Sequence, residues 1–72
     1  MNFENITENM NDDGYDGTWY SVIDGMTCYR IRTDDETNAV YDQENNFIDT
    51  YDDEKAQNAL DELVKYLSKG NR

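Results

Sequence analysis

Residues favoured in β-strands are concentrated in the first patterned stretch of the chain, residues 18–23. Asp24-Gly25 follows, and an Asp-Gly pair beside such a stretch is the strongest short-range signal for a two-residue hairpin turn. Residues 26–33 supply a returning strand. The pattern therefore predicts a β-hairpin over residues 18–33.

The position of the turn determines which side chains of this hairpin share a face. With Asp24 and Gly25 as the loop, the pairs on one face are Val22 with Thr27, Tyr20 with Tyr29, and Thr18 with Ile31. The pairs on the other face are Ile23 with Met26, Ser21 with Cys28, and Trp19 with Arg30. This register would stack Arg30 on the ring of Trp19 in a cation–π contact.

A second hairpin is expected where residues 38–41 and 47–51 resemble strands and a polar loop separates them. The predicted pairs are Val40 with Ile48 on one face and Tyr41 with Phe47 on the other. A slip of one residue would exchange the two faces, because side chains alternate along a strand.

The last part of the chain predicts an amphipathic helix. Asp52 or Asp53 can cap its N-terminus, and Gly70 is a natural stop. Apolar residues at helical spacing form one stripe along it: Ala56, Ala59, Leu60, Leu63, Val64 and Leu67.

Together these elements predict an α+β fold, in which a small antiparallel β-sheet of two hairpins, about four strands, carries one C-terminal α-helix on one face. We expect a single β-β-β-β-α domain over residues 18–72, preceded by a flexible acidic segment over residues 1–17. Within that segment, Phe3, Ile6 and Met10 have the spacing of a short N-terminal helix.

One helix can cover only one face of the predicted sheet. The face against the helix would carry Val22, Tyr20, Tyr29, Ile31, Val40 and Ile48, and the opposite face would carry Trp19, Ile23, Met26, Tyr41, Phe47 and Tyr51. The second face must therefore be shielded by the N-terminal segment, by another copy of the chain, or by a partner.

Charge changes the functional picture more than any other property. The chain has 17 Asp and Glu against 6 Lys and Arg, no His, and a formal net charge of −11. Such a charge repels phosphates, so direct binding to nucleic acid or to an anionic membrane is not expected. It favours a basic protein partner instead, although solubility or salt adaptation would explain the same charge.

The sequence offers little chemistry for catalysis, and we expect neither an enzyme nor a cofactor. There is no His to act as a base, and the only cysteine, Cys28, has no neighbour to activate it. Neither of the glycine-rich phosphate-binding motifs GxGxxG and GxxxxGK[ST] occurs. No signal-peptide pattern or membrane-spanning apolar run is present, so we expect a cytoplasmic protein.

The stretch NDDGYDG, residues 11–17, resembles the first half of a calcium-binding loop. Such a loop needs a bidentate Glu at its twelfth position. Starting at Asp12 places Ile23 there, and starting at Asn11 places Val22 there. Because neither side chain can bind calcium, no metal site is predicted.

The acids are most concentrated between residues 34 and 54, where no Lys or Arg occurs. On the predicted topology these acids could imitate a row of nucleic-acid phosphates and occupy a positively charged groove. The expected partner-binding acids are Asp34, Asp35, Glu36, Asp42, Glu44, Asp49, Asp52 and Asp53, and the expected aromatic contacts are Trp19, Tyr41, Phe47 and Tyr51.

In size, charge and expected architecture, the chain resembles small phage-encoded inhibitors that mimic DNA and block restriction, CRISPR or repair enzymes. This resemblance implies a non-enzymatic inhibitor of a nucleic-acid-binding host or defence protein, acting in the host cytoplasm. It carries no residue-level role, because such inhibitors share no common motif. The alternative is a small protein–protein adaptor, or a homodimer, that uses the aromatic sheet face while its acidity serves solubility alone.

Overall fold

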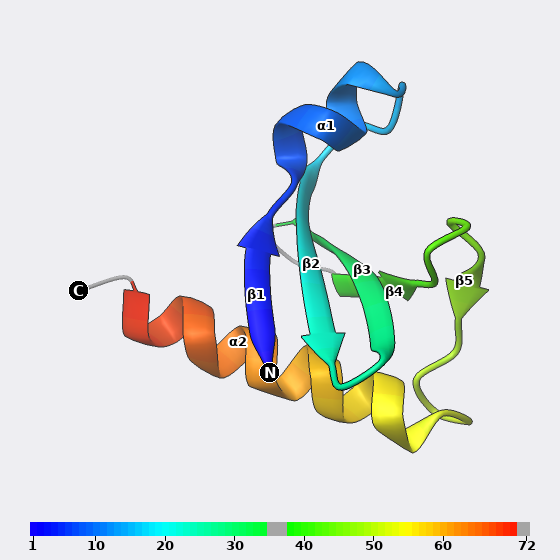
Figure 1. Cartoon of the computed structure of the whole chain (residues 1–72), viewed down its shortest axis with the longest axis vertical. Coiled ribbons are helices and arrows are strands. Elements are labelled where there is room, and N and C mark those ends of the chain that lie inside the picture. The colour runs from blue at the N-terminus through cyan, green and yellow to red at the C-terminus, as the bar shows by residue number, and fades with distance from the viewer. Residues whose placement is uncertain (35–37, 71–72) are drawn as a thin grey trace.

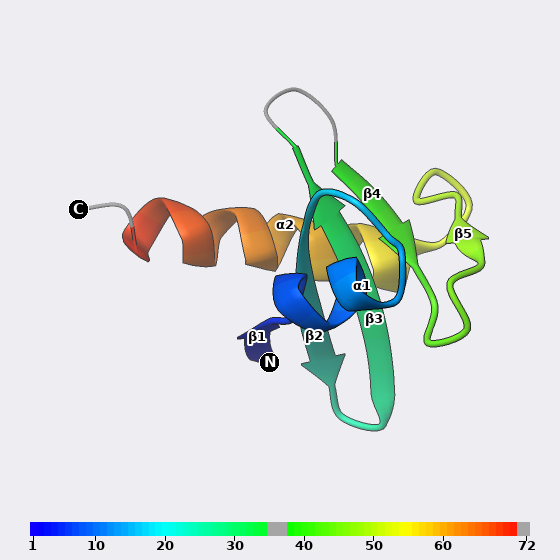
Figure 2. The same ribbon diagram turned by 90° about the horizontal axis from the view of Figure 1, so that it is seen from above.

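The computed structural model describes residues 1–34 and 38–70 and has a single antiparallel sheet between two helices (Figure 1). The elements are β1 (Asn2–Asn5), α1 (Thr7–Asp12), β2 (Thr18–Asp24), β3 (Thr27–Thr33), β4 (Asn38–Tyr41), β5 (Phe47–Ile48) and α2 (Glu54–Gly70). The strands follow chain order across the sheet, from β1 at one edge to β5 at the other. Figure 2 shows α1 in front of the sheet and α2 behind it, running across the strands. The predicted α+β class is confirmed, with five strands instead of four.

The additional strand is β1, which pairs with β2 so that Phe3 lies opposite Val22. The ring of Phe3 packs on the core and stacks on Tyr66 of α2, with 4.6 Å between ring centroids. Residues 2–12 thus contribute a strand and a short helix to the same fold, where the sequence predicted a separate segment before residue 18. The predicted short helix is present, but it begins at Thr7, so Phe3 lies on β1 and not on the helix.

The register of the first hairpin differs from the prediction by two residues. Asp24 pairs with Thr27, so the loop is Gly25-Met26 and not Asp24-Gly25. Gly25 has a φ of 62°, and glycine at the first loop position is typical of the type II′ turn. A loop of Asp24-Gly25 would instead favour the type I′ turn, in which Asp24 would also need a positive φ. Because a two-residue shift keeps each side chain on its face, the predicted faces are unchanged.

The second hairpin has the predicted register, with Val40 opposite Ile48 and Tyr41 opposite Phe47. Its returning strand is shorter than expected and ends at Ile48. The chain turns there because the Asp49 carboxylate accepts a hydrogen bond from the backbone N–H of Tyr51, 2.9 Å away. Tyr51 therefore lies in a turn before α2 and not on a strand.

The core lies between α2 and the face of the sheet predicted to meet it. Its buried residues are Val22, Tyr29, Ile31 and Val40 from the sheet and Ala56, Ala59 and Leu63 from the helix, with Phe3, Tyr20, Ile48, Leu60 and Leu67 packed around them. Val64 was predicted to join the helix stripe but is 43% exposed. Asp53 caps α2, since its carboxylate accepts a hydrogen bond from the N–H of Ala56 at 3.1 Å.

Candidate protein-binding surface

The N-terminal helix α1 covers Trp19 on the face of the sheet opposite α2. Met10 of α1 is 2% exposed and Trp19 is 3% exposed. The connection is fixed by two hydrogen bonds. The N–H of Ile6 donates to the Trp19 carbonyl at 2.9 Å, and the N–H of Trp19 donates to the side-chain hydroxyl of Thr7 at 3.0 Å. The indole N–H of Trp19 donates to the Asp16 carbonyl. The sequence predicted that this face is shielded by the N-terminal segment, by another copy of the chain, or by a partner. At Trp19 the N-terminal segment provides the shielding.

An aromatic row crosses this same face from the loop after α1 to β5. Tyr15 contacts Trp19, Trp19 contacts Tyr41, and Tyr41 contacts Phe47, with centroid separations of 6.1, 5.3 and 5.9 Å. Exposure increases from the buried Trp19 toward both ends, to 40% at Tyr15 and 67% at Phe47. The row therefore joins a packed centre to rings that are available at the surface.

Two arginines of β3 are engaged with the loops around this row. Arg30 donates a hydrogen bond to Asn45 Oδ1 at 2.9 Å. Arg32 lies against Gly17, where a β-carbon would collide with the guanidinium group, and its Nε is 3.2 Å from the Asp34 carboxylate. In the register observed, Trp19 lies opposite Arg32 and not opposite Arg30, so the predicted pairing of Trp19 with Arg30 is wrong.

The loop between β4 and β5 is organised by the Asp42 carboxylate. It accepts hydrogen bonds from the backbone N–H groups of Glu44 and Asn46, at 2.8 and 2.9 Å, and from the Asn46 side-chain amide at 3.2 Å. These interactions lower the pKa of Asp42 below its usual range, and the bond from the Asn46 backbone has the largest effect. The other hydrogen bonds and the positive charge of Arg30 also lower this pKa, whereas desolvation raises it. Asn45 completes the loop with a φ of 65°.

The turn between β5 and α2 is held by two further aspartates. Asp49 accepts from the N–H of Tyr51, and Asp53 caps α2. The charge of Asp53 also acts on the buried Tyr29. Burial is the larger cause of the raised pKa of this phenol, and the charges of Asp53 and Asp24 add to it.

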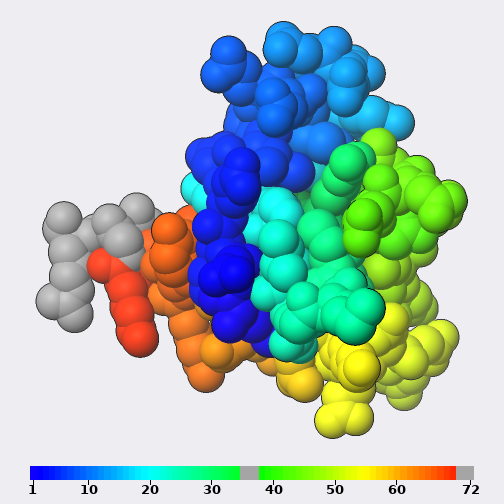
Figure 3. Space-filling model, viewed as in Figure 1, coloured from blue at the N-terminus to red at the C-terminus, as the bar shows by residue number. Residues whose placement is uncertain are grey.

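These two loops and β5 form one side of the molecule, at the right in Figures 1 and 2. In the space-filling view of Figure 3, their green and yellow residues form the right-hand side of the molecule, below the light-blue end of the N-terminal segment. We call this region the β5 surface and define it by Asp42, Glu44, Phe47, Asp49, Tyr51 and Asp52. Tyr51 is 93% exposed, and among the described residues no ion pair involves any of the four acids of this surface.

The predicted partner-binding residues separate into distinct groups. One group belongs to residues 42–52, with Asp42 and Glu44 in the loop before β5, Phe47 on β5, and Asp49, Tyr51 and Asp52 in the turn after it. The half-buried Tyr41 and Asp53 adjoin this stretch in the sequence. Asp34 lies apart and is paired with Arg32, and Asp35 and Glu36 lie outside the described residues. Trp19 was predicted to contact a partner, but its burial under α1 makes it part of the packed interior.

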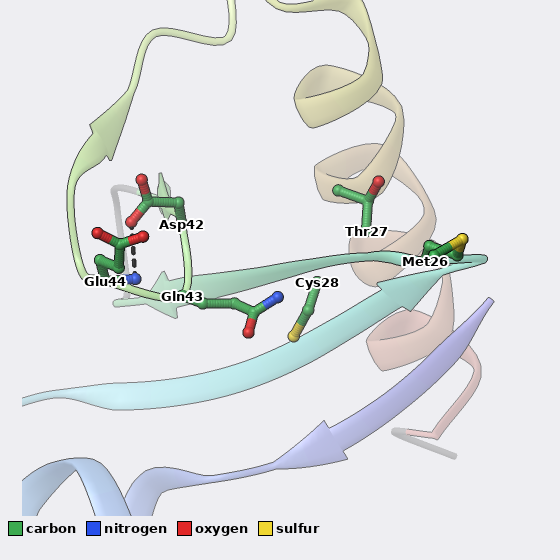
Figure 4. A pocket seen from close by; sticks show the side chains of 6 residues that line it. All are labelled: Met26, Thr27, Cys28, Asp42, Gln43 and Glu44. Atoms are coloured by element: carbon green, nitrogen blue, oxygen red, sulfur yellow. Dashed lines mark hydrogen bonds between the residues drawn. The ribbon is translucent and has the colours of Figure 1, made fainter.

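A shallow depression of about 570 Å³ lies beside the β5 surface, between the β2–β3 turn and the 42–46 loop (Figure 4). Its lining residues are Met26, Thr27, Cys28, Asp42, Gln43 and Glu44. The Gln43 side chain extends toward Cys28, whose sulfur is 3.4 Å from Ser21 Oγ. Sequence reasoning did not single out Thr27 or Gln43, because only the fold brings the turn and the loop together.

In the described parts of the chain, no group of three or more Cys, Asp or Glu side chains has the arrangement needed to hold a metal ion. The same residues include no helix that is long and apolar enough to cross a membrane. In comparisons with known proteins, the chain matches no family model, no curated protein and no solved structure.

Proposed function

We propose that this protein is an acidic, non-enzymatic inhibitor that imitates nucleic acid and occupies the positively charged groove of a DNA- or RNA-binding protein. The observation that carries the proposal is the β5 surface, which has four carboxylates without ion-pair partners among the described residues and two exposed rings. A groove built for phosphates supplies the complementary Lys and Arg side chains.

Two of the four carboxylates of this surface are held in place before any partner arrives. Asp42 and Asp49 are fixed by hydrogen bonds within their own loops, so little side-chain freedom remains to be lost on binding. The net charge of −11 adds long-range attraction toward a basic groove and accelerates the encounter. Among such targets, a host or defence enzyme of the CRISPR or restriction type in a cell infected by phage is the setting we propose, with the inhibitor acting in the host cytoplasm.

Charge reversal tests this proposal, and the structure indicates which acids to reverse. Glu44 and Asp52 are exposed and accept no hydrogen bond in the described structure, whereas Asp42, Asp49 and Asp53 hold the loops and the helix. We expect Glu44→Lys combined with Asp52→Lys to weaken partner binding by about tenfold or more, without unfolding the chain.

The matched control is Glu4→Lys with Glu8→Lys, which changes the net charge equally at exposed positions on β1 and α1. Binding would be measured by calorimetry with the protein captured from the native host and washed at rising salt. If both double variants lose the same affinity for the partner, net charge alone determines binding. If Glu44→Lys with Asp52→Lys loses no affinity, the proposal is refuted.

A second candidate function is an adaptor that binds through apolar contacts, or a homodimer that uses the same rings. It is favoured by the exposure of Phe47, Tyr51 and Met26, the last of which is fully exposed at the β2–β3 turn. Binding would then tolerate added salt and be weakened more by Phe47→Ala than by charge reversal. Sedimentation at several concentrations would detect the homodimer.

A further inference from the structure

The outer side of β1 is an open edge of the sheet. Among the described residues, β1 pairs with β2 and with no other strand. The N–H of Ile6, directly after β1, donates to the Trp19 carbonyl of β2, and in an antiparallel strand the hydrogen-bonding groups alternate between the two sides. The N–H and carbonyl groups of Phe3 and Asn5 therefore point away from the sheet, where a further strand can pair with them.

The two edges of the sheet differ in how well they accept another strand. β5 has two residues, and the chain turns away at Asp49. β1 has four residues and contains neither Pro nor Lys, which proteins commonly place on edge strands to prevent pairing. In Figures 1 and 2, the last turns of α2 extend past β1 on the side away from β2. A strand added to β1 would therefore lie over the end of this helix.

The side of α2 that lies at β1 carries charges of both signs. Phe3 stacks on Tyr66, which places this side of the helix against the strand. Glu62 and Lys69 share the side of Tyr66 by helical spacing. Lys65 pairs with Glu62, with 3.3 Å between Nζ and Oε2.

β1 and the last turns of α2 are thus the neutral region of an acidic chain. Residues 1–6 and 62–70 contain two acids and two bases, so the formal charge of −11 is carried entirely by the other residues. A basic partner gains no electrostatic attraction from a neutral region, whereas two acidic copies of one chain repel each other least where they meet through it. The charge distribution therefore favours a second copy of this chain as the occupant of the edge.

The sequence of β1 favours one register for antiparallel pairing between two copies. A register centred on Glu4 would place two carboxylates directly opposite each other, which is destabilising. A register centred on Phe3 places Glu4 opposite the second copy's Asn2 instead. It also brings the two half-buried Phe3 rings together on the face that α2 covers, where paired aromatic side chains add stabilisation.

We propose that this protein forms a homodimer in which β1 pairs with β1 of a second copy, antiparallel and centred on Phe3, so that the two sheets become continuous. This dimer differs from one made through the rings of the β5 surface. Because β5 lies at the opposite edge of the sheet, both copies keep that surface exposed. The inference therefore goes beyond the proposed function and does not depend on it.

Two measurements on the full chain test this dimer directly. Sedimentation equilibrium over a range of concentrations gives its dissociation constant, and amide hydrogen exchange at low and high concentration locates the contact. We expect dimerisation to strengthen with added salt, because salt screens the repulsion between two acidic copies. The amides of Phe3 and Asn5 should exchange more slowly at the concentration where the dimer predominates.

A substitution at Asn2 tests the register. Asn2→Glu places a carboxylate opposite the second copy's Glu4 and should raise the dissociation constant of the dimer. Asn9→Glu is the matched control, because Asn9 is exposed on α1 and the change in net charge is the same. We expect the constant to be at least about threefold higher for Asn2→Glu than for Asn9→Glu, and lower for Asn2→Lys than for Asn9→Lys.

The outcomes that would overturn this inference are distinct from those that test the proposed function. A chain that stays monomeric at every concentration and salt, or a dimer that leaves the amides of Phe3 and Asn5 unprotected, would overturn it. Equal constants for Asn2→Glu and Asn9→Glu would overturn the pairing centred on Phe3. Protection of these amides only when another protein is added would assign the edge to that protein's strand and not to a second copy. None of these results changes the expected effect of Glu44→Lys with Asp52→Lys on partner binding.

Discussion

Trp19 and Phe47 belong to one row of contacting rings on one face of the sheet, yet one is buried and the other is exposed. Trp19 lies beneath α1, and its backbone and indole are bonded to the N-terminal segment. Phe47 lies on a two-residue edge strand and is 67% exposed, whereas its neighbour Ile48 packs on the core. The position of a side chain on a sheet face therefore does not decide its role; the segment packed over it does.

The two ends also differ in how their polar groups are used. Near Trp19, the N–H groups and carbonyls connect one segment to another, from Ile6 and Thr7 to β2. Near Phe47, the carboxylates of Asp42 and Asp49 satisfy N–H groups of their own loops. The first arrangement stabilises the fold, whereas the second shapes a surface.

Truncating the two rings should separate these roles most strongly. Trp19→Ala removes a buried indole and should cost about 3–5 kcal/mol, comparable with the whole stability of a small domain. Phe47→Ala removes an exposed ring and should cost about 1 kcal/mol or less. Urea unfolding followed by circular dichroism measures both free energies. Similar costs for the two variants would contradict the assignment of Trp19 to the interior and Phe47 to the surface.

The start of α2 offers a matched pair of aspartates at the edge of the β5 surface. Asp53→Ala removes the helix cap and should cost about 1 kcal/mol, whereas Asp52→Ala should change stability by less than about 0.5 kcal/mol. Thermal melting would measure the loss of stability in each variant and so show which aspartate caps the helix. A larger loss for Asp52→Ala would mean that the cap lies one residue earlier.

Acidification should weaken the 42–46 loop, with the smallest effect of the three. Because the folded-state pKa of Asp42 is lowered, its stabilisation is present above the unfolded value of ~3.9 and is lost as the pH falls through the folded value. Asp42→Asn should therefore lower the urea midpoint at neutral pH. Below about pH 4, the urea midpoints of the variant and of the unmodified chain should become more similar. A gap that persists at low pH would show that the ionised carboxylate is not what stabilises the loop.

The sequence predicted elements with strong local signals and missed those that depend on tertiary contacts. Hydrophobic spacing predicted α2 and the face of the sheet it covers, and the apolar pairs predicted the second hairpin's register. β1 was missed because Asn2-Phe3-Glu4-Asn5 has little strand preference of its own, and pairing with β2 supplies its hydrogen bonds.

The same limit applies to the predicted site. Clustered acids identified the loops around β5, because turns and helix caps favour Asp locally. Trp19 was assigned to the exposed face because nothing in the local pattern indicates that α1 folds back over it. Asp53 was one of two candidate caps, and only the geometry of the first helical turn distinguishes it from Asp52.

The brevity of β5 has a consequence for solubility in the cell. A long, flat edge strand with exposed rings is a template for edge-to-edge aggregation, because its free N–H and carbonyl groups can pair with another chain. Here the strand ends after Ile48, Asp49 turns the chain away, and carboxylates border both sides. This edge of the sheet therefore offers only a two-residue strand as a template for pairing with another chain.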